Sequence, residues 1–172
     1  MDDLSRYIRD VPDFPKPGIL FKDITTLLKD RRALTMALDR LQEAVSGRNI
    51  DIIAGIESRG FIFGAALADR IGVGFVPIRK PGKLPAETLS ESYTLEYGEN
   101  TVEIHTDAVQ ANQRVLMVDD LLATGGTMAA SCRLVERLGG RVAAIAFLIE
   151  LAFLSGREKL RDYEVITLIR YE

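Results

Sequence analysis

Residues 115–130 read VLMVDDLLATGGTMAA, and this stretch decides how we interpret the fold and where we expect a functional site. Four apolar residues lead into two adjacent carboxylates, Asp119 and Asp120, and a loop with two glycines and two threonines follows. Adjacent carboxylates repel each other, and a glycine pair costs backbone entropy. Because neither feature stabilises the fold, we expect both to serve something outside it.

Apolar strands alternate with helical patterns on both sides of this stretch. Leucines recur at helical spacing over 31–45, and the apolar runs 49–56 and 141–150 are typical of buried strands. Further helices are expected over 61–72 and 127–140, and further strands over 73–80, 114–120 and 163–171. This order predicts an α/β fold, a doubly wound and mainly parallel sheet flanked by helices, with residues 1–172 forming one domain.

Two segments have a looser pattern. Residues 10–24 hold three of the six prolines and should form an extended, ordered arm. Residues 81–92, PGKLPAETLSES, have no clear period and are interpreted as a mobile loop. The alternation in YTLEY and TVEIH, on either side of 98–100, predicts a hairpin.

The composition excludes several classes of protein. A net charge of -3 disfavours a nucleic-acid partner, and no apolar run is long enough for a membrane span. The acidic first ten residues resemble neither a signal nor a transit peptide. Cys132 is the only cysteine and His105 the only histidine, which gives little support to a zinc site or a Ser-His-Asp triad. We expect a protein of the reducing cytoplasm.

The chemistry of the opening stretch points to a phosphorylated sugar. Ligands of doubly wound sheets bind where strands lead into helices, and the glycines let backbone N–H groups converge beside the positive end of a helix. Thr124 and Thr127 add hydroxyl donors. The two carboxylates suit vicinal hydroxyls or a hydrated Mg²⁺. A phosphate next to a diol is a 5-phosphoribose, whereas the P-loop and Rossmann glycine patterns are absent from this stretch.

The stretch resembles the phosphoribosyl pyrophosphate motif of the type I phosphoribosyltransferases. GIESRGFIFGAALA, IRKPGKLP, YTLEYG, SGREKL and the arm FPKPGILFKDIT extend the resemblance over about 11–172 and narrow it to the adenine-specific members. The resemblance implies transfer of 5-phosphoribose from phosphoribosyl pyrophosphate to adenine in purine salvage, which yields AMP and pyrophosphate. It implies a homodimer and Mg²⁺ carried by the substrate rather than bound directly by the protein.

The resemblance also assigns residues to the substrate that carries the sugar. Asp119 and Asp120 would hold the ribose hydroxyls, directly or through magnesium-bound water. The 5′-phosphate would lie in a loop made of Ala123, Thr124, Gly125, Gly126 and Thr127. Pyrophosphate would bind to Ser58 and Arg59, whose guanidinium matches phosphate geometry. Arg79, Lys80 and Lys83 would form a basic cluster that stabilises the leaving group, part of it reaching the neighbouring subunit's site.

For the base, the resemblance points to the arm and to a flexible hood over 81–100. Backbone groups of Leu20 and Lys22 would pair with adenine, Phe21 would stack on it, and Leu121 would lie against it. The family often has Arg where this chain has Lys22, a change that a backbone contact tolerates. On the hood, Glu96 matches an acid near the adenine imidazole, where a proton leaves, and Tyr97 follows it.

Two alternatives remain open at this stage. A xanthine or hypoxanthine phosphoribosyltransferase would share the 119–127 element but neither the arm nor the LEYG hairpin. A regulator that senses phosphoribosyl pyrophosphate without catalysis would need a nucleic-acid surface or an added DNA-binding domain, which the acidic balance disfavours.

Overall fold

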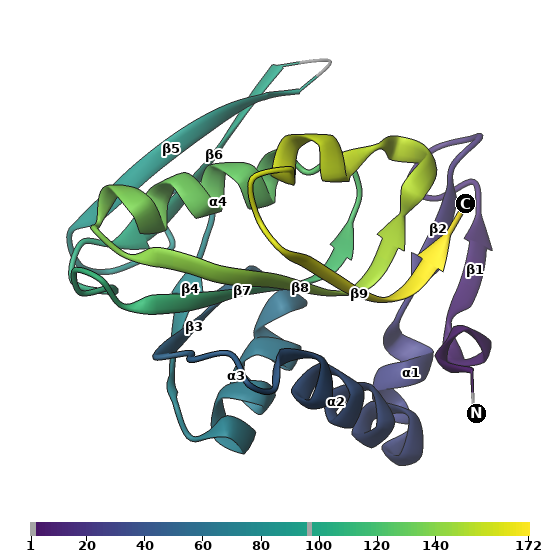
Figure 1. The fold of residues 1–172 in the computed structure, drawn as a ribbon. Helices are drawn as coiled ribbons and strands as arrows, with labels where there is room; N and C mark the ends of the chain where they lie inside the picture. Colours follow the sequence, from purple (N-terminus) through teal and green to yellow (C-terminus); the bar gives the residue numbers. More distant parts are fainter. Residues whose placement is uncertain (1–2, 96–97) are drawn as a thin grey trace.

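The computed structural model describes residues 3–95 and 98–172. A five-stranded sheet forms its centre in the order β4-β3-β7-β8-β9, and each neighbouring pair is parallel. Its strands are β3 (Ile52–Ile56), β4 (Gly74–Ile78), β7 (Arg114–Leu122), β8 (Arg141–Leu151) and β9 (Val165–Tyr171). Helices cover both faces of this sheet (Figure 1), so the predicted α/β architecture is confirmed.

The helices divide between the two faces. Figure 1 shows α1 (Thr25–Lys29), α2 (Arg31–Val45) and α3 (Gly60–Ile71) on one face and α4 (Gly126–Arg137) on the other. The described residues also form three short 3-10 helices, η1 (Leu4–Tyr7), η2 (Ala152–Leu154) and η3 (Gly156–Leu160). α2 begins where the Asp30 carboxylate accepts a hydrogen bond from the Ala33 N–H at 2.9 Å. None of the helices in the described segments is long and apolar enough to cross a membrane.

Alternation along the strands creates two apolar cores. In β7, Leu116 and Val118 pack into the core under α2 and α3, whereas Val115 and Met117 pack into the core under α4. All four side chains are fully buried, which stabilises the fold by about 1.5–3 kcal/mol for each large side chain. Cys132 lies in the α4 core, and burial raises the pKa of its thiol to about 12. A strand buried on both faces explains the uninterrupted apolar run in the sequence.

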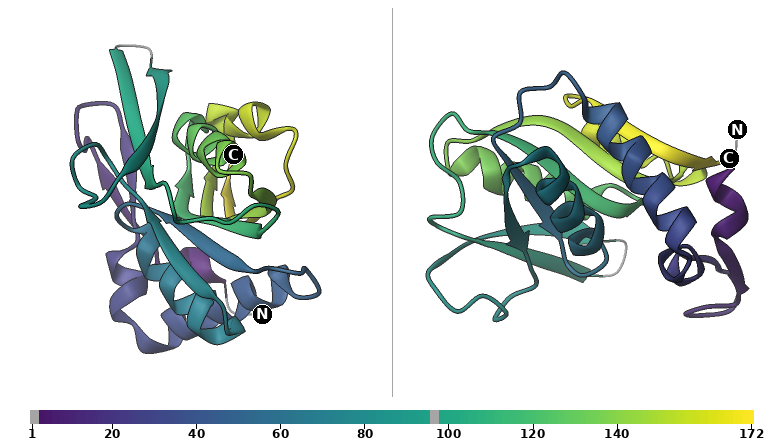
Figure 2. Two further views of the ribbon diagram at one scale, coloured as in Figure 1. Left: turned by 90° about the vertical axis from the view of Figure 1, so that its left-hand side faces the viewer. Right: turned by 90° about the horizontal axis from the view of Figure 1, so that it is seen from below.

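Two small antiparallel sheets extend from this framework. The arm forms β1 (Arg9–Pro12) and β2 (Leu20–Asp23), and the hood forms β5 (Thr88–Leu95) and β6 (Gly98–His105). Figure 2 shows the hood hairpin projecting well beyond the sheet. It is fixed to α4 by Glu91, which accepts hydrogen bonds from Arg133 at 2.7 Å and Arg137 at 2.8 Å.

The interpretation of 81–92 as a loop is wrong for its second half. Residues from Thr88 onward pair with β6, and the Ser92 and Thr101 hydroxyls are 2.8 Å apart across the ladder. Leu89 packs against the α4 core. The hairpin register and the α4 contacts therefore impose a strand where the local pattern is weak.

Candidate active site

The candidate site lies at the carboxyl ends of three neighbouring strands. β3 connects through α3 to β4 on one side, whereas β7 leads to β8 and β9 on the other, so the order in which strands are added to the sheet reverses between β3 and β7. Ligands of such sheets bind at this switch point. A cavity of about 720 Å³ opens there. Of the predicted residues, those lining it are Ser58 and Arg59 after β3, Arg79 and Lys80 after β4, and Asp119, Asp120, Leu121 and Thr127.

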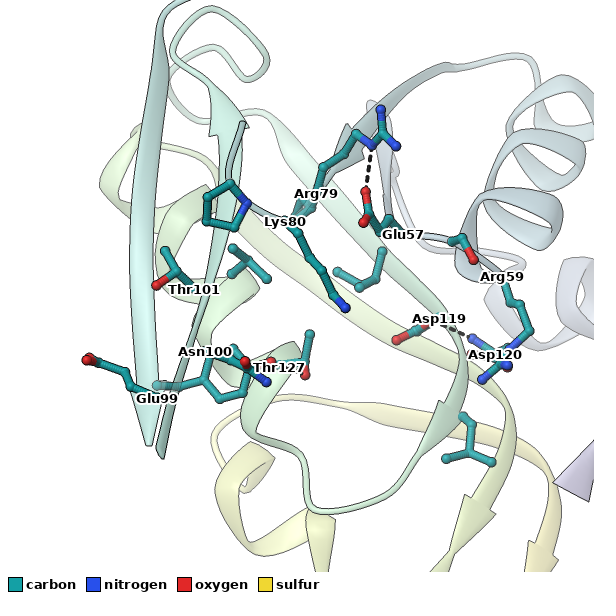
Figure 3. Close-up of a pocket in the computed structure, with 17 residues that line it drawn as sticks. Glu57, Arg59, Arg79, Lys80, Glu99, Asn100, Thr101, Asp119, Asp120 and Thr127 are labelled. Atoms are coloured by element: carbon teal, nitrogen blue, oxygen red, sulfur yellow. Dashed lines mark hydrogen bonds and ion pairs between the residues drawn. The ribbon is translucent and has the colours of Figure 1, made fainter. Parts of the chain in front are cut away.

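The two acids have different surroundings although they are adjacent in β7. Asp120 is buried, and its carboxylate accepts a hydrogen bond from Arg59 Nε at 2.5 Å (Figure 3). Asp119 is partly exposed to the cavity, and one of its carboxylate oxygens accepts from the Asp120 N–H at 2.8 Å. Desolvation and the charge of Asp120 raise the pKa of Asp119 well above its usual range.

Gly60 brings the Arg59 turn against β7. A Cβ atom on Gly60 would lie 2.8 Å from the Val118 carbonyl oxygen and 2.9 Å from an Asp119 carboxylate oxygen. Because that approach excludes any side chain, the first turn of α3 packs directly on the strand that carries both acids. The sequence shows the glycine in ESRG, but this use of it appears only in the folded chain.

The loop 123–127 connects β7 to α4 beside the acids. Gly125 has a φ of +78° and is the N-cap of α4, which has no side-chain cap in the described part of the chain. α3 likewise lacks a side-chain cap, in contrast to α2. A recess of about 80 Å³, the volume of roughly two to three waters, is lined by all five loop residues. Both helix starts therefore offer backbone N–H groups to an anion.

The predicted basic cluster is only partly assembled. Arg79 donates a hydrogen bond to the Glu57 carboxylate at 2.6 Å and another to the Lys83 carbonyl oxygen at 3.3 Å. Figure 3 shows Lys80 extending from the end of β4 toward Asp119. Lys83 is exposed and does not line the cavity, because the chain turns away after Pro81.

The arm approaches the site through one aromatic ring. Arg59 Cζ lies 5.5 Å from the centroid of the Phe21 ring, and Phe14 packs edge-on against the same ring at 5.1 Å. The Lys22 ammonium is 2.6 Å from an Asp10 carboxylate oxygen and 3.9 Å from the centroid of the Tyr171 ring, which holds its side chain in place. Leu20 is half exposed. None of these three predicted residues lines the cavity, and Phe21 approaches it through Arg59.

Sequence reasoning missed one contact of the hood. The Tyr93 and Thr127 hydroxyl oxygens are 2.8 Å apart, so the hood hairpin contacts the 123–127 loop directly. Tyr93 belongs to the quoted YTLEYG motif, where its alternation with Thr94 was the only available signal. Glu96 and Tyr97 lie outside the described residues.

Comparison with known proteins agrees with this geometry. Residues 24–170 match the phosphoribosyl transferase domain family, which places the chain in that class of proteins. An adenine phosphoribosyltransferase of Caldanaerobacter subterraneus is 60% identical over 99% of both chains. The crystal structure of the Thermoanaerobacter pseudethanolicus adenine phosphoribosyltransferase has a TM-score of 0.96 and 60% identity, and covers 98% of both chains.

A more distant relative is known with ligands. The Saccharomyces cerevisiae adenine phosphoribosyltransferase, in complex with adenine and an imino-altritol bisphosphate, is 44% identical over 96% of both chains, with a TM-score of 0.88. High identity over nearly the full length leads to a plain conclusion. The chain belongs to the adenine phosphoribosyltransferase family.

Proposed function

We propose that the cavity binds phosphoribosyl pyrophosphate and adenine, and that residues 1–172 act as one unit that forms AMP and pyrophosphate. The observation that carries this proposal is the position of the Asp119–Asp120 pair between two uncapped helix starts, those of α3 and α4. Phosphoribosyl pyrophosphate carries a diphosphate on one side of its diol and a phosphate on the other. This order matches a carboxylate pair that lies between two helix starts. Family membership supports adenine as the base.

Each segment then has a defined task in the transfer. The 123–127 loop holds the 5′-phosphate through backbone amides and the Thr124 and Thr127 hydroxyls. Asp120 and Asp119 accept hydrogen bonds from the ribose hydroxyls. When these hydroxyls bind, Arg59 exchanges its contact with Asp120 for one with pyrophosphate, and Ser58 lies beside it. Phe21 stacks on the base, the backbone of Leu20 and Lys22 reads its edge, and Leu121 packs against it.

The reaction forms a bond from adenine N9 to the ribose C1′ while the bond from C1′ to pyrophosphate breaks. Negative charge builds up on the leaving pyrophosphate, and Arg59, Arg79 and Lys80 are the cations that line the cavity where it develops. The proton on the adenine imidazole leaves during attack, and Glu96 is the group we assign to accept it. Closure of the hood, with Tyr97, would exclude water from the reacting carbon.

The carboxylate pair fits a magnesium ion that arrives with the substrate. Among the described residues, no cluster of three or more His, Cys, Asp or Glu side chains could hold a metal ion. Mg²⁺ keeps several waters and binds through one or two carboxylates together with substrate phosphates, which Asp119 and Asp120 satisfy. The ion would neutralise diphosphate charge, while the two carboxylates orient its waters and the sugar.

We further propose a homodimer that works in the cytoplasm. Lys83 supports the dimer because it is exposed outside the cavity of its own chain, where it is available to a neighbouring subunit. The single, buried Cys132 supports a reducing compartment, because a protein made for an oxidising one commonly carries disulfides.

The test is turnover with each purine base. The protein is incubated with phosphoribosyl pyrophosphate, Mg²⁺ and adenine, hypoxanthine, guanine or xanthine, and the nucleotide is followed by absorbance. AMP from adenine alone supports the proposal. Nucleotide formed only from an oxopurine would favour the related hypoxanthine or xanthine enzymes, and tight binding without turnover of any base would indicate a sensor.

A further inference from the structure

The segment 155–160, which contains the quoted SGREKL motif, lies outside the cavity but directly behind the 123–127 loop. A Cβ atom on Gly156 would lie 2.2 Å from the Ala123 carbonyl oxygen, and one on Gly125 would lie 2.4 Å from the Gly156 carbonyl oxygen. These distances are far below any real contact of a Cβ atom. The backbones of the two segments are therefore in direct contact. Gly156 leaves room for the backbone of Ala123, and Gly125 leaves room for the backbone of Gly156.

Glycine is required at position 156 because the Ala123 backbone packs against it, and not because of the backbone conformation of residue 156 itself. Gly125 has a φ of +78°, which by itself favours glycine, and Ser155 has a φ of +53°. Gly156 is not in the left-handed region, so an alanine there would be conformationally ordinary. The only obstacle to a methyl group is the packing around it, chiefly the backbone of Ala123.

An ion pair with a buried carboxylate and a partly exposed guanidinium fixes the segment to the sheet. Arg157 donates to both carboxylate oxygens of Glu150 in β8, at 2.7 and 2.8 Å, and to the Val165 carbonyl oxygen at 3.1 Å. The Thr167 hydroxyl in β9 donates to the same carboxylate at 3.0 Å. The Glu150 carboxylate is almost completely buried and has all of these donors, whereas Arg157 is partly exposed, so the carboxylate end of the network is the shielded one.

We propose that Gly156 is a positioning residue for the 5′-phosphate, held in place by the Glu150–Arg157 pair. A five-residue loop with two glycines has many accessible conformations, and ordering it around a phosphate would cost entropy at each binding event. A rigid backbone behind the loop removes that freedom before the ligand arrives. The inference rests on the proposed assignment of the 123–127 loop to the 5′-phosphate.

The experiment compares two ligands that use different ends of the cavity. Affinities for ribose 5-phosphate and for pyrophosphate are measured separately by calorimetry in the wild type and in Gly156→Ala. We expect ribose 5-phosphate binding to weaken by about tenfold or more, because the loop must shift to admit the methyl group. Pyrophosphate binding, which uses the turn at 57–60, should stay unchanged.

Two variants accompany this test. Gly74→Ala is the matched control, since a Cβ atom there would meet nothing nearer than 3.8 Å and its φ is also outside the left-handed region. It should leave both affinities unchanged. Glu150→Gln loosens the network without adding an atom to the interface, so it serves if Gly156→Ala does not fold. Its ribose 5-phosphate affinity should fall by a smaller factor, again without effect on pyrophosphate.

The outcomes distinguish failure of the positioning role of Gly156 from failure of the assignment of the 123–127 loop to the 5′-phosphate. Unchanged ribose 5-phosphate binding in Gly156→Ala, or equal losses for both ligands, overturns the positioning role. Thr124→Val tests the underlying assignment, because its hydroxyl belongs to the loop itself. If Thr124→Val leaves ribose 5-phosphate binding unaffected, the phosphate assignment is wrong. If it weakens binding while Gly156→Ala does not, only the positioning role is lost.

Discussion

Replacement of Tyr93 by Phe should weaken the binding of the 5′-phosphate indirectly, through Thr127. The Tyr93 hydroxyl is 2.8 Å from the Thr127 hydroxyl, and either oxygen can be the donor. A phosphate dianion accepts hydrogen bonds, so the Thr127 hydroxyl must use its single O–H to donate a hydrogen bond to the phosphate. The Tyr93 hydroxyl then has to donate to Thr127, and the two bonds strengthen each other.

The energy of one neutral hydrogen bond sets the upper limit of the effect, because the bond is also present without the phosphate and only its strengthening on binding changes the affinity. Such a bond contributes about 0.5–1.5 kcal/mol net, so the affinity should fall by at most roughly two- to twelvefold. The assay is the dissociation constant of ribose 5-phosphate in wild type, Tyr93→Phe, Thr127→Val and the double variant. The double-mutant cycle should give a coupling energy that is above zero and does not exceed that limit.

Ser92→Ala is the matched control for this experiment. It removes a hydroxyl contact of the same length, 2.8 Å to Thr101, from the neighbouring position of the same strand. Ribose 5-phosphate affinity should not change in this control. Tighter binding by Tyr93→Phe would refute the reasoning, since it would mean that Tyr93 competes with the phosphate for Thr127. Zero coupling in the cycle would show that the two hydroxyls act independently.

The remaining predictions concern the carboxylates of Asp120, Asp119 and Glu96. Asp120→Asn should lower kcat/KM for phosphoribosyl pyrophosphate by about tenfold or more while circular dichroism shows an intact fold, because Arg59 is partly exposed and water can solvate it. Asp119→Asn should raise Tm at pH 7–8. The raised pKa of Asp119 means that its stability penalty grows as pH rises from about 4 through the folded pKa, so the gain should vanish below about pH 4. If Tm shifts equally at every pH, Asp119 ionisation is not the cause. Glu96→Leu should reduce kcat more than it changes KM, and an unchanged kcat would remove Glu96 from the mechanism.

Much of the fold was available from local patterns. The apolar runs at 49–56 and 141–150 predict strands of a sheet buried on both faces, and the helix over 31–45 has the bounds that the helical spacing of its leucines indicates. These signals are reliable because side chains alternate along strands and recur each turn along helices. The hood strand from Thr88 was missed because its pairing with β6, not its own composition, makes it a strand.

The sequence by itself determined which residue types are available at the candidate site: paired acids before a glycine–threonine loop, and a second arginine-bearing turn. Tertiary structure alone decided how they are arranged. It joins Arg59 to Asp120 across 61 positions, leaves Lys83 outside the cavity, and sets Gly156 against Ala123. The physical reason is that charge, hydroxyl content and glycine are properties of single positions. Contacts between distant segments exist only after the parallel register has placed the ends of β3 and β7 side by side.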